Sequence, residues 1–248
     1  MLTAHRPRLS PPRVLLVLDR PLLGEVIKLA LAHGRAVTRL APTVAAATEA
    51  RQAWAPHLAV VDMDLVDGVP LDRFGAAAAG GERLPLIALT RRGDLATKLA
   101  AFEQGVDDIL TVPFSPEELV ARILAVLRRT YRAAVPFAPV LRLGELELDL
   151  LNRRVRVGGH DLQLTALDQS LLYLLAANAG RVLSRDEILD CLWGVDFLAD
   201  SNVVDRHVRN LRAKLQNDWH RPRYIATVPG RGYRFVPTTA PAPPAAAP

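Results

Sequence analysis

The sequence predicts a two-domain chain in which an α/β doubly wound (βα)5 domain with a parallel sheet precedes a winged helix-turn-helix domain. Three observations predict this fold class. Short apolar runs alternate five times with helically spaced segments in the first half, which is typical of a parallel sheet covered by helices on both faces. The segment TYRAAVPFAPV, 130–140, is rich in alanine and proline and separates the halves. The second half combines short alternating segments, three helices and a terminal hairpin.

The five apolar runs of the first half are the expected strands. They lie at 14–18, 36–41, 58–61, 86–89 and 108–112. The helices between and after them are expected at about 21–33, 44–54, 69–79, 94–104 and 115–129. Ser115, Pro116 and Glu118 mark the start of the last helix, as N-cap, first helical residue and partner in a capping box.

The second half shows equally local signals. A helix within LTALDQSLLYLLAANAG should end at Gly180, and a second should follow Ser184, with Glu187 closing a capping box. A third helix is expected from about Ser201 to Gln216, before a two-stranded ribbon in YIATVPGRGYRFV. We place the domains at 13–130 and 140–236, the linker at 131–139, and disordered ends at 1–12 and 237–248, which lack core-forming side chains.

Composition and charge narrow the function classes. The chain has 248 residues and a net charge of +5, and its basic character is concentrated in 206–234, where eight basic residues face one acid, a net of +7. A local basic patch favours a polyanion partner. Cys191 is the single cysteine, so neither an internal disulfide nor a cysteine-based metal cluster is expected within one chain. We see no membrane span or secretory signal and expect a cytoplasmic protein.

Polar side chains near the strand ends define a candidate site. Ligands of open parallel sheets bind beyond the carboxyl ends of the strands. The first expected strand ends in Leu18 and Asp19, the third in Asp62, the fourth in Thr90 and the fifth in Val112.

Both halves resemble a known family. The motifs VVDMD, LIALT and GVDDILTVPFSPEELVARI resemble the receiver domain of a bacterial response regulator. The motifs GRVLSRDEIL, VVDRHVRNLRAKL and RYIATVPGRGYRF are similar to the DNA-binding domain of the OmpR/PhoB family. Together the matches cover about residues 13–236. The resemblance implies a transcription regulator that binds double-stranded DNA in a sequence-specific way and is not an enzyme.

The resemblance assigns Asp62 as the phosphoacceptor position, with Asp19 and Asp62 as ligands of Mg²⁺ and Thr90 as a contact of the phosphoryl group. Leu18 stands where the family has a second acid, and Val112 where it has a lysine. The aromatic reporter position of the fifth strand holds Ile109. The pocket is therefore expected to be degenerate, with Mg²⁺ at most weakly bound and no cofactor required.

Three alternatives stay open for this pocket. Asp64 and Asp67 follow Asp62 closely enough to substitute as metal ligands, which would keep a conventional phosphorylation-activated regulator. Asp62 can equally be a structural acid that caps nearby amides. The Asp-x-Asp sequence of Asp62 and Asp64 also resembles the nucleophile motif of phosphohydrolases, although that motif usually opens its fold.

The resemblance further implies a receiver homodimer and a DNA-reading helix. The charged residues that match the family's dimer face are Lys98, Glu103, Asp107, Asp108, Glu118 and Arg122. We expect Lys98 with Glu118, and Asp108 with Arg122, to pair across the dimer, the alternative being solvated helix charges. The expected DNA contacts are Asn202, Arg206, His207, Arg209, Asn210, Arg212, Lys214 and, at the tip of the hairpin, Arg231. The loop 193–201 matches a segment that meets RNA polymerase in the family, whereas the histidine kinase partner is left open.

Overall fold

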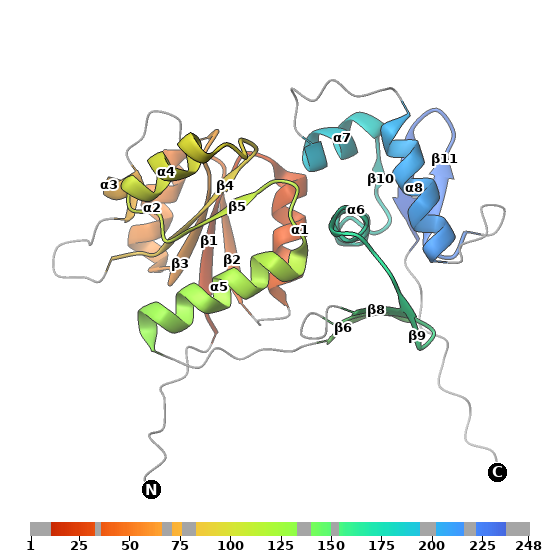
Figure 1. The fold of residues 1–248 in the computed structure, drawn as a ribbon, viewed down its shortest axis with the longest axis horizontal. Helices are drawn as coiled ribbons and strands as arrows, with labels where there is room; N and C mark the ends of the chain where they lie inside the picture. Colours follow the sequence, from red (N-terminus) through yellow and green to blue (C-terminus); the bar gives the residue numbers. More distant parts are fainter. Residues whose placement is uncertain are drawn as a thin grey trace, which may run out of the picture.

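The computed structural model describes residues 11–32, 36–65, 71–75, 83–132, 140–149, 154–193, 202–215 and 222–236, and it confirms the predicted fold class (Figure 1). A five-stranded parallel sheet forms the first domain, and a winged helix-turn-helix forms the second. No helix in these ranges is both long enough and apolar enough to cross a membrane.

The first domain is built on a sheet with the strand order β2-β1-β3-β4-β5. Its strands are β1 (Arg13–Val17), β2 (Val37–Ala41), β3 (Leu58–Asp62), β4 (Leu86–Thr90) and β5 (Asp108–Thr111). All neighbouring strands are parallel, with Val14 of β1 opposite Leu58 of β3 and Thr90 of β4 opposite Thr111 of β5. This order places the ends of β1, β3, β4 and β5 along one edge of the sheet.

Helices cover both faces of that sheet. They are α1 (Pro21–Ala32), α2 (Val44–Trp54), α3 (Leu71–Gly75), α4 (Leu95–Glu103) and α5 (Pro116–Tyr131). The apolar side chains of α1 and α5 pack with one set of alternate strand residues, and those of α2, α3 and α4 pack with the other set. This alternation follows from the period of two along a strand, which points successive side chains to opposite faces.

Local capping explains most helix starts. Ser115 accepts a hydrogen bond from the Glu118 amide at 3.2 Å, with Pro116 in the first turn, as expected. The Glu118 carboxylate accepts from Arg122, so it serves an ion pair further along the helix. The helix expected at 69–79 is described only as α3, because 66–70 and 76–82 lie outside the described residues.

The second domain begins with a four-stranded antiparallel sheet. Its strands are β6 (Val140–Leu143), β7 (Leu146–Asp149), β8 (Arg154–Val157) and β9 (His160–Leu162). Three helices follow, α6 (Ala166–Ala177), α7 (Arg185–Trp193) and α8 (Val203–Lys214), with β10 (Val182–Leu183) between the first two. The predicted capping box of Ser184 and Glu187 forms, with the two reciprocal bonds at 3.0 and 2.8 Å.

The terminal hairpin is the wing. Strands β11 (Ile225–Val228) and β12 (Gly232–Phe235) pair antiparallel, and β10 pairs with the other side of β12. Gly232 has φ 140°, and a Cβ atom there would lie 2.0 Å from the Leu183 carbonyl oxygen. Only glycine fits where these two backbones approach so closely.

The expected domain ends fall mainly outside the described residues. Residues 1–10, 133–139 and 237–248 are not described. Helix α5 continues through Tyr131, the first residue of the expected linker. Pro12, within the expected disordered start, accepts a hydrogen bond from the Val37 amide at 2.8 Å.

Candidate functional sites

The first candidate site surrounds Asp62 at the carboxyl end of β3. The Asp62 side chain is almost fully buried, with 1% of the residue exposed. Its Oδ2 accepts a hydrogen bond from the Arg20 guanidinium, and its Oδ1 accepts one from the Asp64 amide at 3.0 Å. Both carboxylate oxygens are therefore engaged within the chain. A buried carboxylate needs such partners, because an unpaired charge away from water costs several kcal/mol.

Arg20 is a member of this pocket that sequence reasoning missed. It follows Asp19 in the loop between β1 and α1, and the parallel neighbours β1 and β3 bring that loop beside Asp62. The available signal was a basic residue directly after the end of the first strand. Arginine suits this position because its guanidinium stays charged even when largely removed from water.

The two substituted positions lie in the apolar core. Leu18 is 0% exposed and Val112 is 6% exposed, and both belong to the cluster beneath α1 and α5. The Val112 amide donates to the Thr90 carbonyl at 2.8 Å, which extends the pairing of β4 and β5. Their side chains supply packing at the two positions where the resemblance predicts charge.

The remaining expected pocket residues are arranged around Asp62 without forming a cation site. Asp19 is exposed, and the buried Thr90 hydroxyl accepts from the Arg92 amide at 3.0 Å. Asp64 pairs with Arg91 at 3.1 Å. In the described part of the chain no three His, Cys, Asp or Glu side chains come together as metal ligands. Asp67 lies outside that part.

These residues do not fit Mg²⁺ in the arrangement observed. A hard cation is held by several oxygen ligands, whereas among the described residues no set of carboxylates gathers at Asp62. Asp19 is exposed, Asp64 pairs with Arg91, and Asp62 itself pairs with Arg20. The Arg20 guanidinium supplies positive charge directly at the carboxylate. Arg20 is thus the counter-ion of Asp62 within the chain itself.

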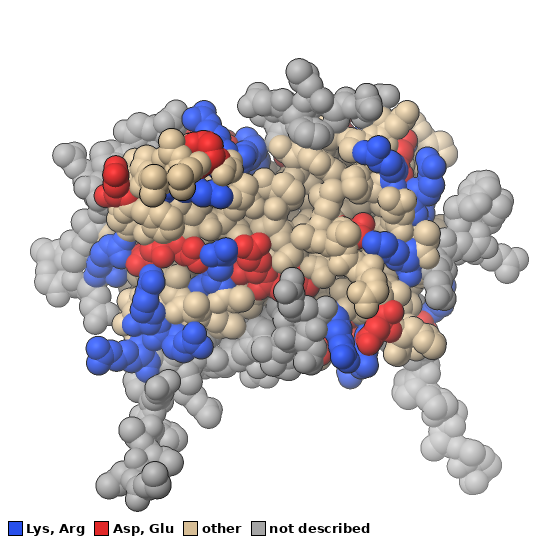
Figure 2. All heavy atoms as spheres, viewed as in Figure 1, with Lys and Arg blue, Asp and Glu red and all other residues tan. Residues whose placement is uncertain are grey.

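The second candidate site is the outward face of α8. Val204, Val208 and Leu211 are buried and fix the helix on the domain core. The exposed expected contacts are Asn202, which directly precedes α8, then Arg206, Arg209 and Asn210 on α8, and Arg231 in the turn between β11 and β12. Figure 2 shows Lys and Arg side chains gathered on the side of the second domain where α8 and β11 lie. Arg and Asn are the side chains best suited to guanine and adenine edges.

Three other expected DNA contacts are held within the domain. Arg212 donates to the Ile225 carbonyl at 2.9 Å and to the Thr227 hydroxyl at 2.8 Å, so it joins α8 to the wing. Lys214 pairs with the buried Asp168 of α6 at 2.5 Å. His207 packs against Trp193, with 5.5 Å between the ring centroids. Burial, and then the nearby Arg206, lower the pKa of His207, so its ring is neutral at pH 7.

A polar network orients the reading helix. Asp205 on α8 accepts from Arg185 of α7 at 2.7 Å and from the Tyr233 hydroxyl of β12 at 2.6 Å. Burial raises the pKa of the Tyr233 phenol, and the bond to Asp205 raises it further. The hydroxyl therefore remains a donor, and Tyr233 serves as a framework residue that holds α8 against β12.

Comparison with known proteins matches each of the two domains to a known family. The family described as "Response regulator receiver domain" matches residues 14–124, and that described as "Transcriptional regulatory protein, C terminal" matches 159–235. The transcriptional regulatory protein TrcR of Mycobacterium tuberculosis is 36% identical over 94% of this chain and 90% of TrcR. The DNA-binding response regulator MtrA of Mycolicibacterium smegmatis is 34% identical over 91% of this chain and 97% of MtrA.

The chain is a response regulator of the OmpR/PhoB family. It is a DNA-binding transcription regulator of the two-component class and not an enzyme, which removes the phosphohydrolase alternative. The solved structure of the Thermotoga maritima response regulator DrrB, an OmpR/PhoB homolog, is 28% identical and covers 91% of this chain and 99% of DrrB, with a TM-score of 0.42.

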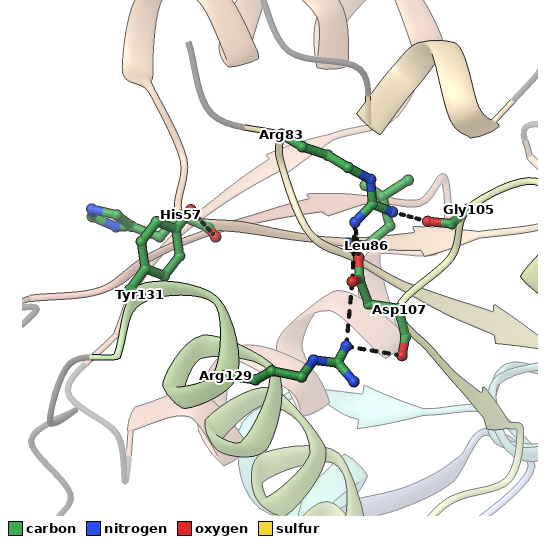
Figure 3. Close-up of polar contacts among 7 residues, drawn as sticks. All are labelled: His57, Arg83, Leu86, Gly105, Asp107, Arg129 and Tyr131. Carbon is green, nitrogen blue, oxygen red and sulfur yellow. Dashed lines mark hydrogen bonds and ion pairs between the residues drawn. The ribbon is translucent and has the colours of Figure 1, made fainter.

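Four of the six predicted dimer residues of this response regulator form ion pairs within the single chain, namely Asp107, Asp108, Glu118 and Arg122. Arg122 contacts Asp108 at 2.8 Å and Glu118 at 2.7 Å. Figure 3 shows Asp107 between Arg83 and Arg129, at 2.9 and 3.3 Å. Asp107 also accepts from the Leu86 amide at 2.9 Å, so it joins the starts of β4 and β5. The Glu103 side chain is exposed and Lys98 is half-buried on α4.

Figure 3 also shows how the end of α5 is fastened to the sheet. The Tyr131 hydroxyl donates to the His57 carbonyl at 2.8 Å, and the two rings meet edge to face. The His57 ring in turn accepts from the Arg13 amide at 2.9 Å. These contacts fix α5 up to the residue before its left-handed cap at Arg132.

Proposed function

We propose that this response regulator dimerises through its receiver domain and binds direct-repeat DNA half-sites with little or no dependence on phosphorylation of Asp62. The observation that carries the proposal is the buried ion pair between Arg20 and Asp62. Burial of Leu18 and Val112 at positions where the family has an acid and a lysine supports it.

The energetic argument concerns the acceptor oxygens. Phosphorylation of Asp62 would disturb the hydrogen bonds that its oxygens now accept, and Mg²⁺ would compete with the positive Arg20 guanidinium at the carboxylate. Losing the lysine at position 112 removes a charge-assisted hydrogen bond worth about 1.5–3 kcal/mol, which is roughly 10- to 100-fold in the stability of the adduct. A phosphoryl group on Asp62 would thus form slowly and be poorly held.

Support for the dimer comes from an exposed apolar stripe on α4. Leu95, Leu99 and Phe102 are 71%, 52% and 48% exposed. Their spacing of i, i+4 and i+7 places them on one face of the helix. Charged Lys98 and Glu103 flank this α4 stripe, and Asp108, Glu118 and Arg122 lie on the neighbouring β5 and α5. A second copy of the receiver would remove the stripe from water and surround it with complementary charge.

Other partners follow from the proposal. DNA is bound through the second domain, and we infer that RNA polymerase is met by the loop 193–201, most of which lies outside the described residues. A dimer formed without phosphate needs no histidine kinase for activation. Mg²⁺ is likewise not required for DNA binding.

The acceptor chemistry is tested by incubation with acetyl phosphate and Mg²⁺, followed by intact-mass measurement. We expect the wild-type protein to remain essentially unmodified and Arg20→Ala to gain a measurable adduct, because its Asp62 oxygen is released. Asp62→Asn identifies the modified site, and Arg92→Ala is the matched control for loss of a nearby exposed arginine. Near-stoichiometric modification of wild-type Asp62 would instead support a conventional phosphorylation-activated regulator.

A further inference from the structure

Helix α6 is buried around its whole circumference. Nine consecutive residues, 168–176, are buried, among them the fully enclosed Tyr173 and the polar Ser170. A surface helix of a small domain buries one stripe and leaves its other side in water. Helix α6 contacts α7, α8 and β12 of its own domain and, beyond that domain, α1 and α5 of the receiver.

The two sides of α6 face different domains. Asp168 points to α8 of its own domain, where it pairs with Lys214. Ser170 donates to the carbonyl oxygen of Phe114, in the segment that joins β5 to α5, at 2.5 Å. Near that contact the buried Glu117 of α5 acts on Tyr173, whose pKa is raised mainly by burial and further by this carboxylate. The receiver is the second partner of α6.

Helix α1 completes this junction. Its buried positions run from Leu22 to Leu31 and occupy about 200° of the helix wheel at 3.6 residues per turn. That arc is wide enough to pack on the sheet and on α6 together, and α1 contacts both α6 and α7. In Figure 1 the red-orange α1 lies between the sheet and the green α6. One continuous apolar cluster consequently joins both domains.

Helix α7 lies over the acceptor end of the receiver. Cys191 is 3% exposed, and burial raises the pKa of its thiol to about 12, against the opposing influence of Arg20 and Arg91. The two arginines that pair with Asp62 and Asp64 are thus close to α7. The junction extends from the Phe114 segment to the rim of the acceptor pocket.

This packing leaves the reading surface open. Arg206, Arg209 and Asn210 of α8 and Arg231 of the wing are exposed while the two domains are in contact. The contacts at the junction are made by α1 and α5 on one side and by α6 and α7 on the other. No rearrangement of the domains is needed to free the four side chains.

We propose that the DNA-binding domain is permanently docked on the receiver through α6, and that this docked arrangement is the form that binds DNA. Packing of the two domains, rather than phosphorylation of Asp62, then fixes the position of α8 relative to the receiver. The proposed docking goes beyond the proposed phosphate independence, because it is right or wrong regardless of whether Asp62 is phosphorylated.

The test uses Cys191, the single thiol of the full-length protein. Its reaction with Ellman's reagent reports whether α7 stays covered. Ser170→Arg places a long charged side chain on the receiver-facing side of α6, where it would be solvated if the domains separated. Ala179→Arg, at an exposed position just beyond the same helix, is the matched control. The DNA probe is a duplex selected by the protein from a random-sequence library.

We expect wild type and Ala179→Arg to react slowly with and without the duplex, and Ser170→Arg to react at least tenfold faster. Fast labelling of the free wild type would show that the domains are not docked. Slow labelling that accelerates on adding DNA would show a contact that DNA must break. Either result overturns the proposal.

Scanning calorimetry provides a readout that does not depend on the thiol. One unfolding transition is expected for the wild type and the Ala179→Arg control, because the two domains share a core. Two transitions are expected for Ser170→Arg, which also shows that both domains still fold. Two well-separated transitions in the wild type would contradict a shared core.

Discussion

At the scale of single residues, the arrangement at Asp62 is set by Arg20, the side chain that places positive charge beside the carboxylate. The family resemblance marks Leu18 and Val112 as expected losses of charge, because the motifs around them fix their positions. It does not identify Arg20 as a partner, because that contact arises only when the loop after β1 is placed beside β3. The positive charge expected at position 112 is supplied instead by Arg20, in the loop that follows β1.

The side chains of α8 divide in a way that spacing did not predict. Arg206 is exposed, whereas Lys214 pairs with Asp168. Both are basic residues of one amphipathic helix, and their difference follows from what each meets within the folded domain. Periodicity locates the buried stripe but does not tell which flanking cations find an internal acid.

Arg206→Ala should weaken binding to the selected duplex by about 1–3 kcal/mol and relax preference at one base position, since a side chain reading a base edge contributes about that much. Competition binding against single-base variants of the duplex measures both effects. Gln52→Ala, at an exposed position of α2 in the receiver, is a control. Unchanged discrimination would remove Arg206 from the readout set.

Lys214→Ala should lower the free energy of unfolding by about 1–3 kcal/mol, because it leaves the buried Asp168 carboxylate without its cation. Burial raises the pKa of Asp168, but the bonds from Lys214 and Thr165 outweigh it and hold that pKa below its ordinary 3.8. This stabilisation is therefore present above pH 3.8 and is lost as the pH falls through the lowered pKa. Urea unfolding of the wild type and of Lys214→Ala at pH 7 and pH 3 measures the loss of stability and its pH dependence. An equal loss of stability at the two pH values would contradict the pairing of Lys214 with Asp168.

Cys191→Ala should make the protein less sensitive to alkali. The folded thiol has its pKa raised to about 12, so between pH 9 and 11 the unfolded chain releases a proton that the folded one keeps. As the pH rises, that difference lowers the free energy of unfolding of the wild type with a slope approaching about 1.4 kcal/mol per pH unit. The variant has no thiol at this position and therefore lacks this slope. Urea titrations across this range compare the slopes, and parallel slopes would show that the thiol is not buried.

At the scale of helices and strands, sequence predicted well wherever the signal was local. The five strands and the helices at α1, α2, α4 and α5 lie within two or three residues of their expected bounds. Alternation, N-caps and the Gly-Arg-Gly turn are each set by a few neighbouring residues. Burial of both sides of α6 was not predicted, because an apolar helix has the same sequence whether its second face meets its own domain or another.

The α4 stripe is the element on which the proposed dimer depends. Leu99→Glu should raise the dimer dissociation constant at least tenfold, because it places a charge at the centre of the proposed apolar contact. Sedimentation velocity of the unphosphorylated protein measures this. Val37→Glu is the matched control, since Val37 is a 45% exposed apolar residue on β2. If the wild type is monomeric, or Leu99→Glu is as dimeric as the control, another surface mediates pairing.

At the scale of the whole molecule, the two domains share one apolar cluster, and the DNA-reading side chains point away from it. The receiver provides the surface on which α6 packs and the exposed α4 stripe. It also contains the Asp62 pocket, in which Arg20 pairs with the carboxylate. The second domain binds DNA, and we propose that its basic side makes the contact. Control by a phosphoryl group would have to act through a pocket whose carboxylate is already paired.

The most direct measurement is DNA affinity and oligomeric state with and without beryllofluoride and Mg²⁺, which imitate the phosphorylated aspartate. We expect the dissociation constant for the selected duplex to change less than about twofold and the sedimentation profile to stay the same, since Arg20 already occupies the Asp62 carboxylate. A protein that dimerises and binds its duplex tightly only after beryllofluoride is added would contradict phosphate-independent function.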